Sequence, residues 1–283
     1  METVANAVLL MDKQLREELF IRDGKIQTKK LWENTYIKKQ LDKRRDGGDF
    51  TVSDHIRGMV YSMLTSGAAW NRLEPHIDTA TGQIPVIDEI FCQYDVTALL
   101  SADPAVLVGR VKEHRLGTQY LTNQISALIG VNIGKLLAIE KEYGSVDHFY
   151  QSLADKNDNL KTLLRELATA GKPYKLAQLG EALTAEYLKN VGYDIGKPDR
   201  HIRRILGSEY LGCSKHQDVP PYEAIDIIAD IAKSLNKPAA EMDYILWAYC
   251  ASGFGEVCTK KNPKCMELCI AKSFCHYKDK QEG

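Results

Sequence analysis

The chain has 283 residues, a formal net charge of −1 and an ordinary balance of apolar (44%) and charged (27%) residues. This length accommodates one large domain or two smaller ones, and the charge argues against coating nucleic acid or membrane by bulk electrostatics. No stretch approaches the roughly 18 apolar residues of a membrane span, and the first residues lack the basic region of a signal peptide. We therefore expect a cytoplasmic protein, nucleoid-associated if bacterial, in which structural disulfides are unfavourable.

Positive charge gathers in three segments despite the neutral total. They are residues 29–45, residues 197–204 and the chain from residue 258 onward, where six lysines outnumber three acidic residues. Solvated helix faces explain any one of these clusters. Three of them on a near-neutral chain favour local contact with a polyanion.

Hydrophobic periodicity is helical almost throughout. After a cap at Ser53, apolar residues recur at i, i+3, i+4 and i+7, namely Ile56, Met59, Val60 and Met63. Residues 74–89 read as a loop or insertion, and Ser101 with Pro104 marks the start of a further helix. No series of alternating strands is found, so the sequence predicts an all-α fold of about a dozen helices.

A similar pattern appears twice more toward the C-terminus. The segment EALTAEYLKNVGY places Leu183, Tyr187, Leu188 and Val191 on one side of a helix. The segment PYEAIDIIADIAKSLNKP does the same with Ile225, Ile228, Ala232 and Leu235, and it stops at Pro238.

A glycine turn precedes the first of these helices. Gly180 lies between two helical patterns, and such a turn exposes backbone N–H groups that suit a phosphate. Helical hairpins with glycine turns are also common without any ligand. Nineteen residues later, Asp199 follows Pro198 and opens a basic helical segment, where helix capping alone would explain it.

These motifs together resemble the helix-hairpin-helix (HhH-GPD) DNA glycosylase superfamily, the group of endonuclease III and the 3-methyladenine glycosylases. There the hairpin reads L-P-G-V-G and an aspartate follows in a V-D-x-H-I context. This chain has LAQLG at 176–180 and DRHI at 199–202. The intervening YLKNVGY is similar to the F-L-R-N-V-G-Y of archaeal members.

The resemblance implies that Asp199 is the catalytic carboxylate, because cleavage of an N-glycosidic bond builds positive charge on the deoxyribose. His201 is either a pocket residue or a packing residue. Superfamily members that also nick the strand carry a lysine two residues after the second hairpin glycine. Here that position is Ala182, preceded by Glu181, so we expect water to be the nucleophile.

The resemblance also implies the DNA contacts. The residues expected to contact DNA are Gln178, Gly180, Ala182, Lys197, Arg200, Lys260, Lys261 and Lys264. A monovalent cation at the hairpin is a further option. In the segment MVYSMLTSGAAWNRL, Gly67 stands where the family has the glutamine that enters the gap left by a flipped base. Trp70 is either a substitute wedge or a core residue.

Four of the seven cysteines form one compact run, C-x6-C-x3-C-x5-C, made by Cys258, Cys265, Cys269 and Cys275. In a reducing compartment such a run indicates a metal or Fe–S site. Its spacing is similar to the C-x6-C-x2-C-x5-C run that holds [4Fe–4S] in endonuclease III relatives, with one extra residue in the middle. Zinc is the alternative. We expect Cys92, Cys213 and Cys250 to be small buried apolar residues.

The resemblance implies two helical lobes, residues 50–190 with the hairpin, and residues 1–49 with 191–283. It further implies a monomeric DNA glycosylase that flips and hydrolytically excises a damaged or modified base from double-stranded DNA, leaving an abasic site. Alkylated purines are favoured over mispaired or deaminated bases and modified pyrimidines. The alternative is a non-catalytic DNA-structure-binding protein on the same scaffold, since Gln178 and Gly67 depart from the family pattern whereas Asp199 keeps it.

Overall fold

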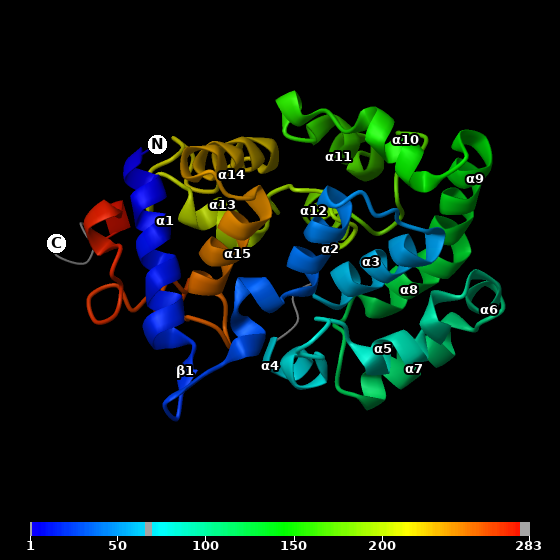
Figure 1. Cartoon of the computed structure of the whole chain (residues 1–283), viewed down its shortest axis with the longest axis horizontal. Coiled ribbons are helices and arrows are strands. Elements are labelled where there is room, and N and C mark those ends of the chain that lie inside the picture. Colours follow the sequence, from blue (N-terminus) through cyan, green and yellow to red (C-terminus); the bar gives the residue numbers. More distant parts are fainter. Residues whose placement is uncertain (1, 66–69, 278–283) are drawn as a thin grey trace. The chain divides into compact units, whose positions relative to one another are not determined.

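The protein forms two compact units in the computed structural model, which describes residues 2–65 and 70–277. The split unit comprises residues 1–35 and 194–283, and the continuous unit comprises residues 36–193. Within the described residues the regular secondary structure of both units is almost wholly helical (Figure 1), which confirms the predicted all-α class. A two-stranded antiparallel ribbon, β1 (Ile21–Arg22) with β2 (Lys25–Ile26), is the exception among these residues.

The continuous unit is a helical bundle. Its helices are α2 (Tyr36–Arg45), α3 (Val52–Leu64), α4 (Trp70–Leu73), α5 (Pro85–Ile90), α6 (Val96–Leu100), α7 (Pro104–Glu113), α8 (Leu121–Ala127), α9 (Ile133–Tyr143), α10 (Val146–Leu153), α11 (Lys161–Ala168) and α12 (Glu181–Asn190). Short 3-10 turns at Glu74–His76, Cys92–Tyr94 and Lys156–Asp158 and a π-turn at Leu128–Asn132 connect them.

Helix α12 lies at the centre of this unit and packs against α3, with α2 and α11 beside it. Every residue from Thr184 to Asn190 is buried, and the predicted α3 stripe, Ile56 to Met63, is buried as well. The close approach needs Gly58, because a Cβ there would lie 3.0 Å from Val191 Cγ1. From Thr184 onward, the helix that follows the hairpin is therefore held by the helices around it.

Three helix boundaries differ from the sequence-based expectation. Helix α3 is capped by Thr51, not Ser53, because Thr51 and Asp54 cap each other reciprocally. Helix α7 is capped by Asp103, not Ser101, with Pro104 in the first turn. Residues 74–89 are not one loop, since a 3-10 turn and α5 lie within them.

The split unit packs α1 (Glu2–Gln14) against α14 (Pro221–Leu235) and α15 (Ala239–Cys250), with α13 (Arg200–Ile205) beside α15. A π-turn at Leu15–Leu19 and 3-10 turns at Thr28–Lys30, Trp32–Asn34 and Lys272–Phe274 complete it. In Figure 1 the red C-terminal segment lies beside the blue α1. The buried Gln14 at the end of α1 joins this segment to α15. Its side-chain amide donates to Leu268 O at 2.6 Å and accepts from the Tyr249 hydroxyl at 2.8 Å.

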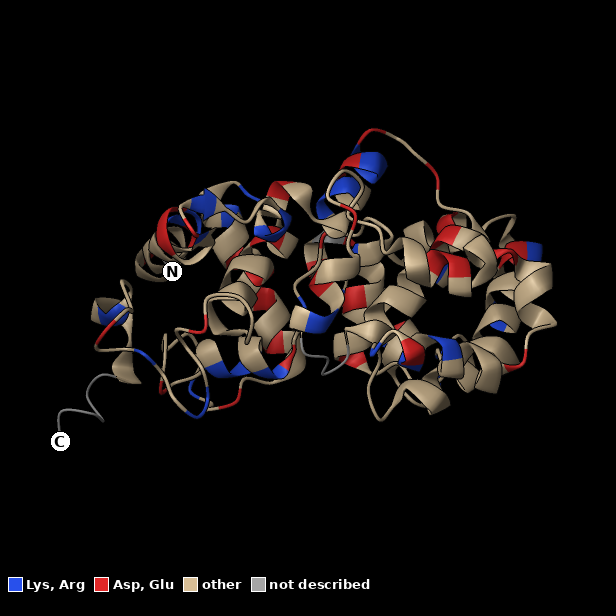
Figure 2. Ribbon diagram, turned by 90° about the horizontal axis from the view of Figure 1, so that it is seen from below, with Lys and Arg blue, Asp and Glu red and all other residues tan. Residues whose placement is uncertain are grey.

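Basic and acidic residues are interspersed along the ribbon (Figure 2), in keeping with the net charge. Among the described residues, no helix combines the length and apolar character needed to cross a membrane.

Candidate active site and cysteine cluster

Asp199 is the N-cap of α13. Its Oδ1 accepts hydrogen bonds from the backbone N–H of His201 at 2.8 Å and of Ile202 at 3.1 Å. Its Oδ2 makes no hydrogen bond or ion pair with the described part of the chain, and the residue is only partly buried. The backbone therefore fixes one oxygen of this carboxylate and leaves the other oxygen available.

His201 lies beside this carboxylate with its Nδ1 buried and without a hydrogen-bond partner among the described residues. Burial lowers the pKa of His201, and Arg200 and Arg204 add to that effect, whereas Asp199 opposes it. A neutral imidazole with one unsatisfied nitrogen is thus placed next to Asp199.

The basic residues near Asp199 divide into two kinds. Arg203 is bonded within the unit, to Val219 O at 2.6 Å and to Asp218 at 3.0 Å, and the Arg204 guanidinium donates to Cys258 O. Arg200 is exposed and makes no hydrogen bond or ion pair with a described residue. Of these three arginines, Arg200 is the one free to contact a polyanion.

The basic segment 29–45 is largely used inside the protein. Lys30 is buried, donates to Gly253 O at 2.6 Å and lies 5.3 Å from the Phe254 ring centroid. Arg44 is held in a buried ion pair, and Lys38 pairs with Asp42 at 2.5 Å. Internal partners therefore bind most of the positive charges that were expected to contact a polyanion in this segment.

The lysines of the C-terminal segment are more accessible. Lys260 and Lys261 are exposed and Lys264 is half-buried.

The hairpin at 176–180 has the geometry of a tight turn. Leu176 and Leu179 are fully buried, and Gln178 and Gly180 are exposed. Gln178 has a φ of 61°, in the left-handed region that favours glycine. Gly180 caps α12, and the N–H groups of Gln178 and Gly180 have no acceptor among the described residues. Gln178 thus occupies a glycine conformation without being glycine.

Gln178→Gly should therefore stabilise the protein. Relief of left-handed strain, roughly 1–2 kcal/mol, exceeds the entropic cost of glycine, roughly 0.5–1 kcal/mol, so we expect a gain of about 0.5–1 kcal/mol. Urea unfolding measures it. Ala177→Gly is the matched control, because Ala177 does not have a positive φ, and it should destabilise. Destabilisation by Gln178→Gly would contradict this account.

The remaining residues of this unit offer fewer contacts. Ala182 and Glu181 lie partly exposed in the first turn of α12, and neither side chain is an amine. Trp70 begins the one-turn helix α4 and is partly exposed. Gly67 lies outside the described residues.

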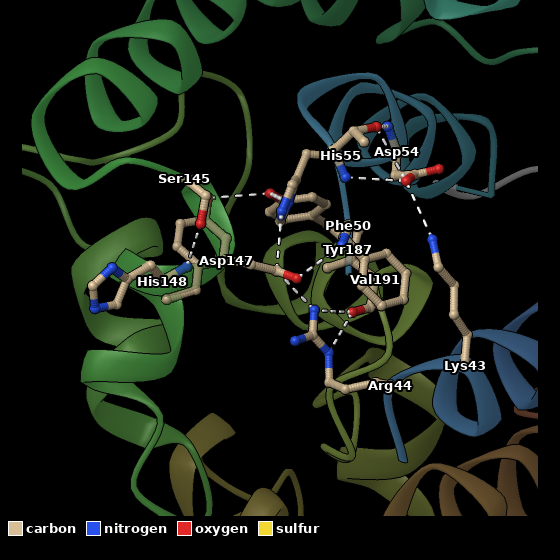
Figure 3. A network of polar contacts seen from close by, with 12 residues as sticks. Lys43, Arg44, Phe50, Asp54, His55, Ser145, Asp147, His148, Tyr187 and Val191 are labelled. Atoms are coloured by element: carbon tan, nitrogen blue, oxygen red, sulfur yellow. Dashed lines mark hydrogen bonds and ion pairs between the residues drawn. The ribbon is translucent and has the colours of Figure 1, made fainter. Parts of the chain in front are cut away.

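A buried polar network joins α2, α3, α10 and α12 (Figure 3). Asp147 is its centre. Its Oδ1 lies 2.8 Å from the Arg44 guanidinium, and its Oδ2 accepts from the Phe50 N–H at 3.0 Å. Arg44 also donates to Val191 O at the end of α12. The sequence pattern does not indicate this network, because its members are far apart in the chain.

His55 extends the network into the core of the continuous unit. It is fully buried, with Nδ1 2.7 Å from the Tyr187 hydroxyl, which in turn lies 3.1 Å from the Tyr150 hydroxyl. Nε2 is 3.3 Å from Asp147 Oδ1 but lacks hydrogen-bond geometry. Burial lowers the pKa of His55 despite this carboxylate. The neutral imidazole of His55 is therefore the form favoured in the folded protein, and we interpret the network as structural.

The four predicted ligand thiols lie in one neighbourhood. Cys265 is within electrostatic range of Cys258, Cys269 and Cys275, and burial together with these thiols raises its pKa to about 11. Cys258 and Cys265 are buried, and the other two are partly exposed. Among the described residues no three His, Cys, Asp or Glu side chains are grouped so as to hold a metal ion. Burial, and after it the neighbouring thiols, disfavour the thiolate form of Cys265, which a bound cation would favour.

Two residues outside the run contact it. The thiol of Cys250 interacts with that of Cys258, and the guanidinium of Arg204 interacts with both. Cys250 is buried as expected, Cys213 is partly exposed, and Cys92 is exposed, so the expectation of burial was wrong for Cys92. Cys92 belongs to a turn in which three consecutive non-glycine residues have positive φ.

Part of the chain is similar to a curated protein, the 8-oxoguanine DNA glycosylase/AP lyase of Aquifex aeolicus strain VF5. The two are 30% identical over 100 residues, which are 34% of this chain and 44% of the relative. The chain thus matches less than half of the relative's length. No protein-family model and no solved structure matches the chain. The similarity supports a relationship to DNA glycosylases.

Proposed function

We propose that this protein is a DNA N-glycosylase without strand-cleaving activity. The observation that carries the proposal is the Asp199 carboxylate, with Oδ1 fixed by the N–H groups of His201 and Ile202 and Oδ2 without a partner among the described residues. The partial similarity to a DNA glycosylase/AP lyase supports the same class of reaction. Double-stranded DNA containing a damaged base is the proposed substrate.

In the proposed reaction a water oxygen bonds to the deoxyribose C1′ while the C1′–N bond breaks. The bonding electron pair leaves with the base, and positive charge develops on the sugar. Asp199 stabilises this charge electrostatically or accepts a proton from the water. An aspartate fixed by two N–H groups needs no reorganisation for this role, because its orientation is set before the substrate binds.

Strand cleavage requires an amine that forms an imine with the sugar. The position that carries this lysine in the resembling enzymes is Ala182, and Glu181 beside it is also no amine. We therefore propose that the abasic site is the final product, unlike that of the relative, whose name includes a lyase activity.

Borohydride trapping tests this assignment. Borohydride reduces an imine to a stable amine, so a covalent complex with abasic DNA reveals a lyase. We expect no complex. A trapped complex would contradict the assignment, and its loss in Lys175→Met would identify Lys175, beside the hairpin, as the amine.

A purine lesion is the proposed base. The resemblance to 3-methyladenine glycosylases favours alkylated purines, and the relative's name supports oxidised guanine. A set of duplexes that each carry one lesion, treated with alkali after incubation, distinguishes these bases from deaminated or mispaired ones. A DNA-structure-binding protein is the second candidate, favoured by Gln178 at a glycine position.

We further propose that Cys258, Cys265, Cys269 and Cys275 hold a [4Fe–4S] cluster. When bound, the cluster would close the C-terminal loop, and the positive charge at this loop would come from the exposed Lys260 and Lys261. The chain supports this loop through Gln14, which donates to Leu268 O, and through Arg204, which donates to Cys258 O.

Cys265→Ser should abolish the cluster, because Cys265 interacts with all three other thiols. We expect loss of bound iron and of the visible absorbance of the cluster, measured on anaerobically purified protein. Cys92→Ser is the control, since Cys92 is exposed in the other unit, and it should retain both signals. A colourless parent protein containing zinc would contradict the proposal.

A further inference from the structure

The hairpin carries its own cation. Lys175 directly precedes the hairpin, and its ammonium donates to Leu176 O at 2.5 Å and to Leu179 O. These two carbonyls belong to the residues whose side chains anchor the turn in the core. The ammonium therefore bridges the two ends of the turn from its carbonyl side.

Two other side chains bind further carbonyls of this stretch. Lys135 donates to Lys175 O and lies 3.5 Å from Pro173 O. The buried Asn132 donates to Ala177 O at 3.0 Å and accepts from the Ala177 N–H at 2.7 Å. Most of the carbonyls between residues 173 and 179 are thus bound by three side chains, Lys135 of α9, Asn132 of the π-helix before it, and Lys175 beside the hairpin.

Backbone carbonyls that converge on one point are ligands for a hard cation. An ammonium of similar size satisfies the same oxygens with N–H donors, and lysine provides three of these donors. Burial lowers the pKa of Lys175, and the charge of Lys135 lowers it further, whereas Glu181 opposes them. The carbonyl hydrogen bonds are the interactions that favour the charged form here.

We propose that Lys175 is the resident cation of the hairpin and replaces a bound potassium or sodium ion. It fixes the carbonyls on one side of the turn, so that the N–H groups of Gln178 and Gly180 remain directed to a DNA phosphate without help from a metal ion. The binding of a DNA phosphate by the hairpin N–H groups rests on the proposed function. The role of Lys175 as the cation of the hairpin does not.

The test compares two salts of equal ionic strength, potassium chloride and tetramethylammonium chloride, whose cation is too large for the carbonyls. The probe is a duplex with a stable abasic analogue. The parent should bind it equally in both salts. Lys175→Met should bind about tenfold more weakly in tetramethylammonium and recover in potassium, because the vacated carbonyls admit the ion.

Lys172→Met is the matched control. It removes the same charge three residues away, but the Lys172 ammonium is exposed and pairs with Glu166 at 3.3 Å, without hairpin carbonyls. We expect a small loss of affinity that is equal in both salts. A parent that needs potassium, or a Lys175→Met protein that behaves like Lys172→Met, would overturn the inference.

A second measurement without DNA separates this inference from the proposed function. Potassium should raise the unfolding temperature of Lys175→Met above its value in tetramethylammonium, and should change neither the parent nor Lys172→Met. If the parent binds no DNA, the proposed function fails while this measurement still decides the role of Lys175. Equal potassium effects on all three proteins would overturn the inference.

Discussion

Asp199→Asn should lower the rate of base release by about 10²–10⁴-fold, the usual contribution of a positioned acid–base group. Asparagine is an equally good N-cap, so the hydrogen bonds to His201 and Ile202 should persist and the fold should be kept. What is lost is the negative charge that opposes the developing sugar cation. Single-turnover release of a purine lesion measures the effect, and binding of the same duplex should be unchanged.

Asp103→Asn is the control for this substitution. Asp103 caps α7 through the N–H of Ala105 at 2.8 Å, in the other unit, so the same chemical change should leave base release at the parent rate. If Asp199→Asn and the parent release every lesion at the same rate, Asp199 is only a helix cap. The binding protein then becomes the better account.

Asp147→Ala should have the largest effect on stability. It removes the partner of the buried Arg44 and the acceptor of the Phe50 N–H. Loss of one member of a buried ion pair costs about 3–5 kcal/mol, a large share of the roughly 5–15 kcal/mol that a typical domain has. Urea unfolding measures this cost. Asp42→Ala is the control, because Asp42 pairs with Lys38 and Arg45 at the surface and should cost at most about 1 kcal/mol.

The same network makes stability fall on acidification. Burial lowers the pKa of His55 in the folded protein, so the unfolded chain takes up its proton first and stability falls as the pH drops below the ordinary histidine value of 6.5. Although burial alone would raise it, His55 and Arg44 hold the pKa of Asp147 below 3.8, and its contribution is lost at still lower pH. Replacing His55 by Gln should remove the first of these two losses. An unchanged pH profile would contradict this.

Sequence periodicity predicted the buried face of α3 correctly. Ile56, Met59, Val60 and Met63 are buried as their spacing predicted, because a 3.6-residue repeat specifies one helix face regardless of the tertiary partner. The cap of α3 was misplaced by two residues, since both Thr51 and Ser53 are cap formers and only the reciprocal bond of Thr51 with Asp54 distinguishes them.

The contacts between residues far apart in the chain could not be predicted from the sequence. Nothing in the spacing of Asn132, Lys135 and Lys175 indicates that their side chains meet at the hairpin carbonyls. The same holds for Arg204 and Cys250 beside Cys258. The exposed turn of Cys92 was also missed, because three consecutive left-handed residues without glycine contradict local propensity.

Base excision without strand cleavage is tested with duplexes that carry 8-oxoguanine or an alkylated purine, each incubated with the protein and analysed with and without alkali. The proposal predicts strand breaks at the lesion only after alkali, together with release of the free base. Breaks without alkali would show a lyase, and no release from any duplex would show that the chain does not act as a purine glycosylase.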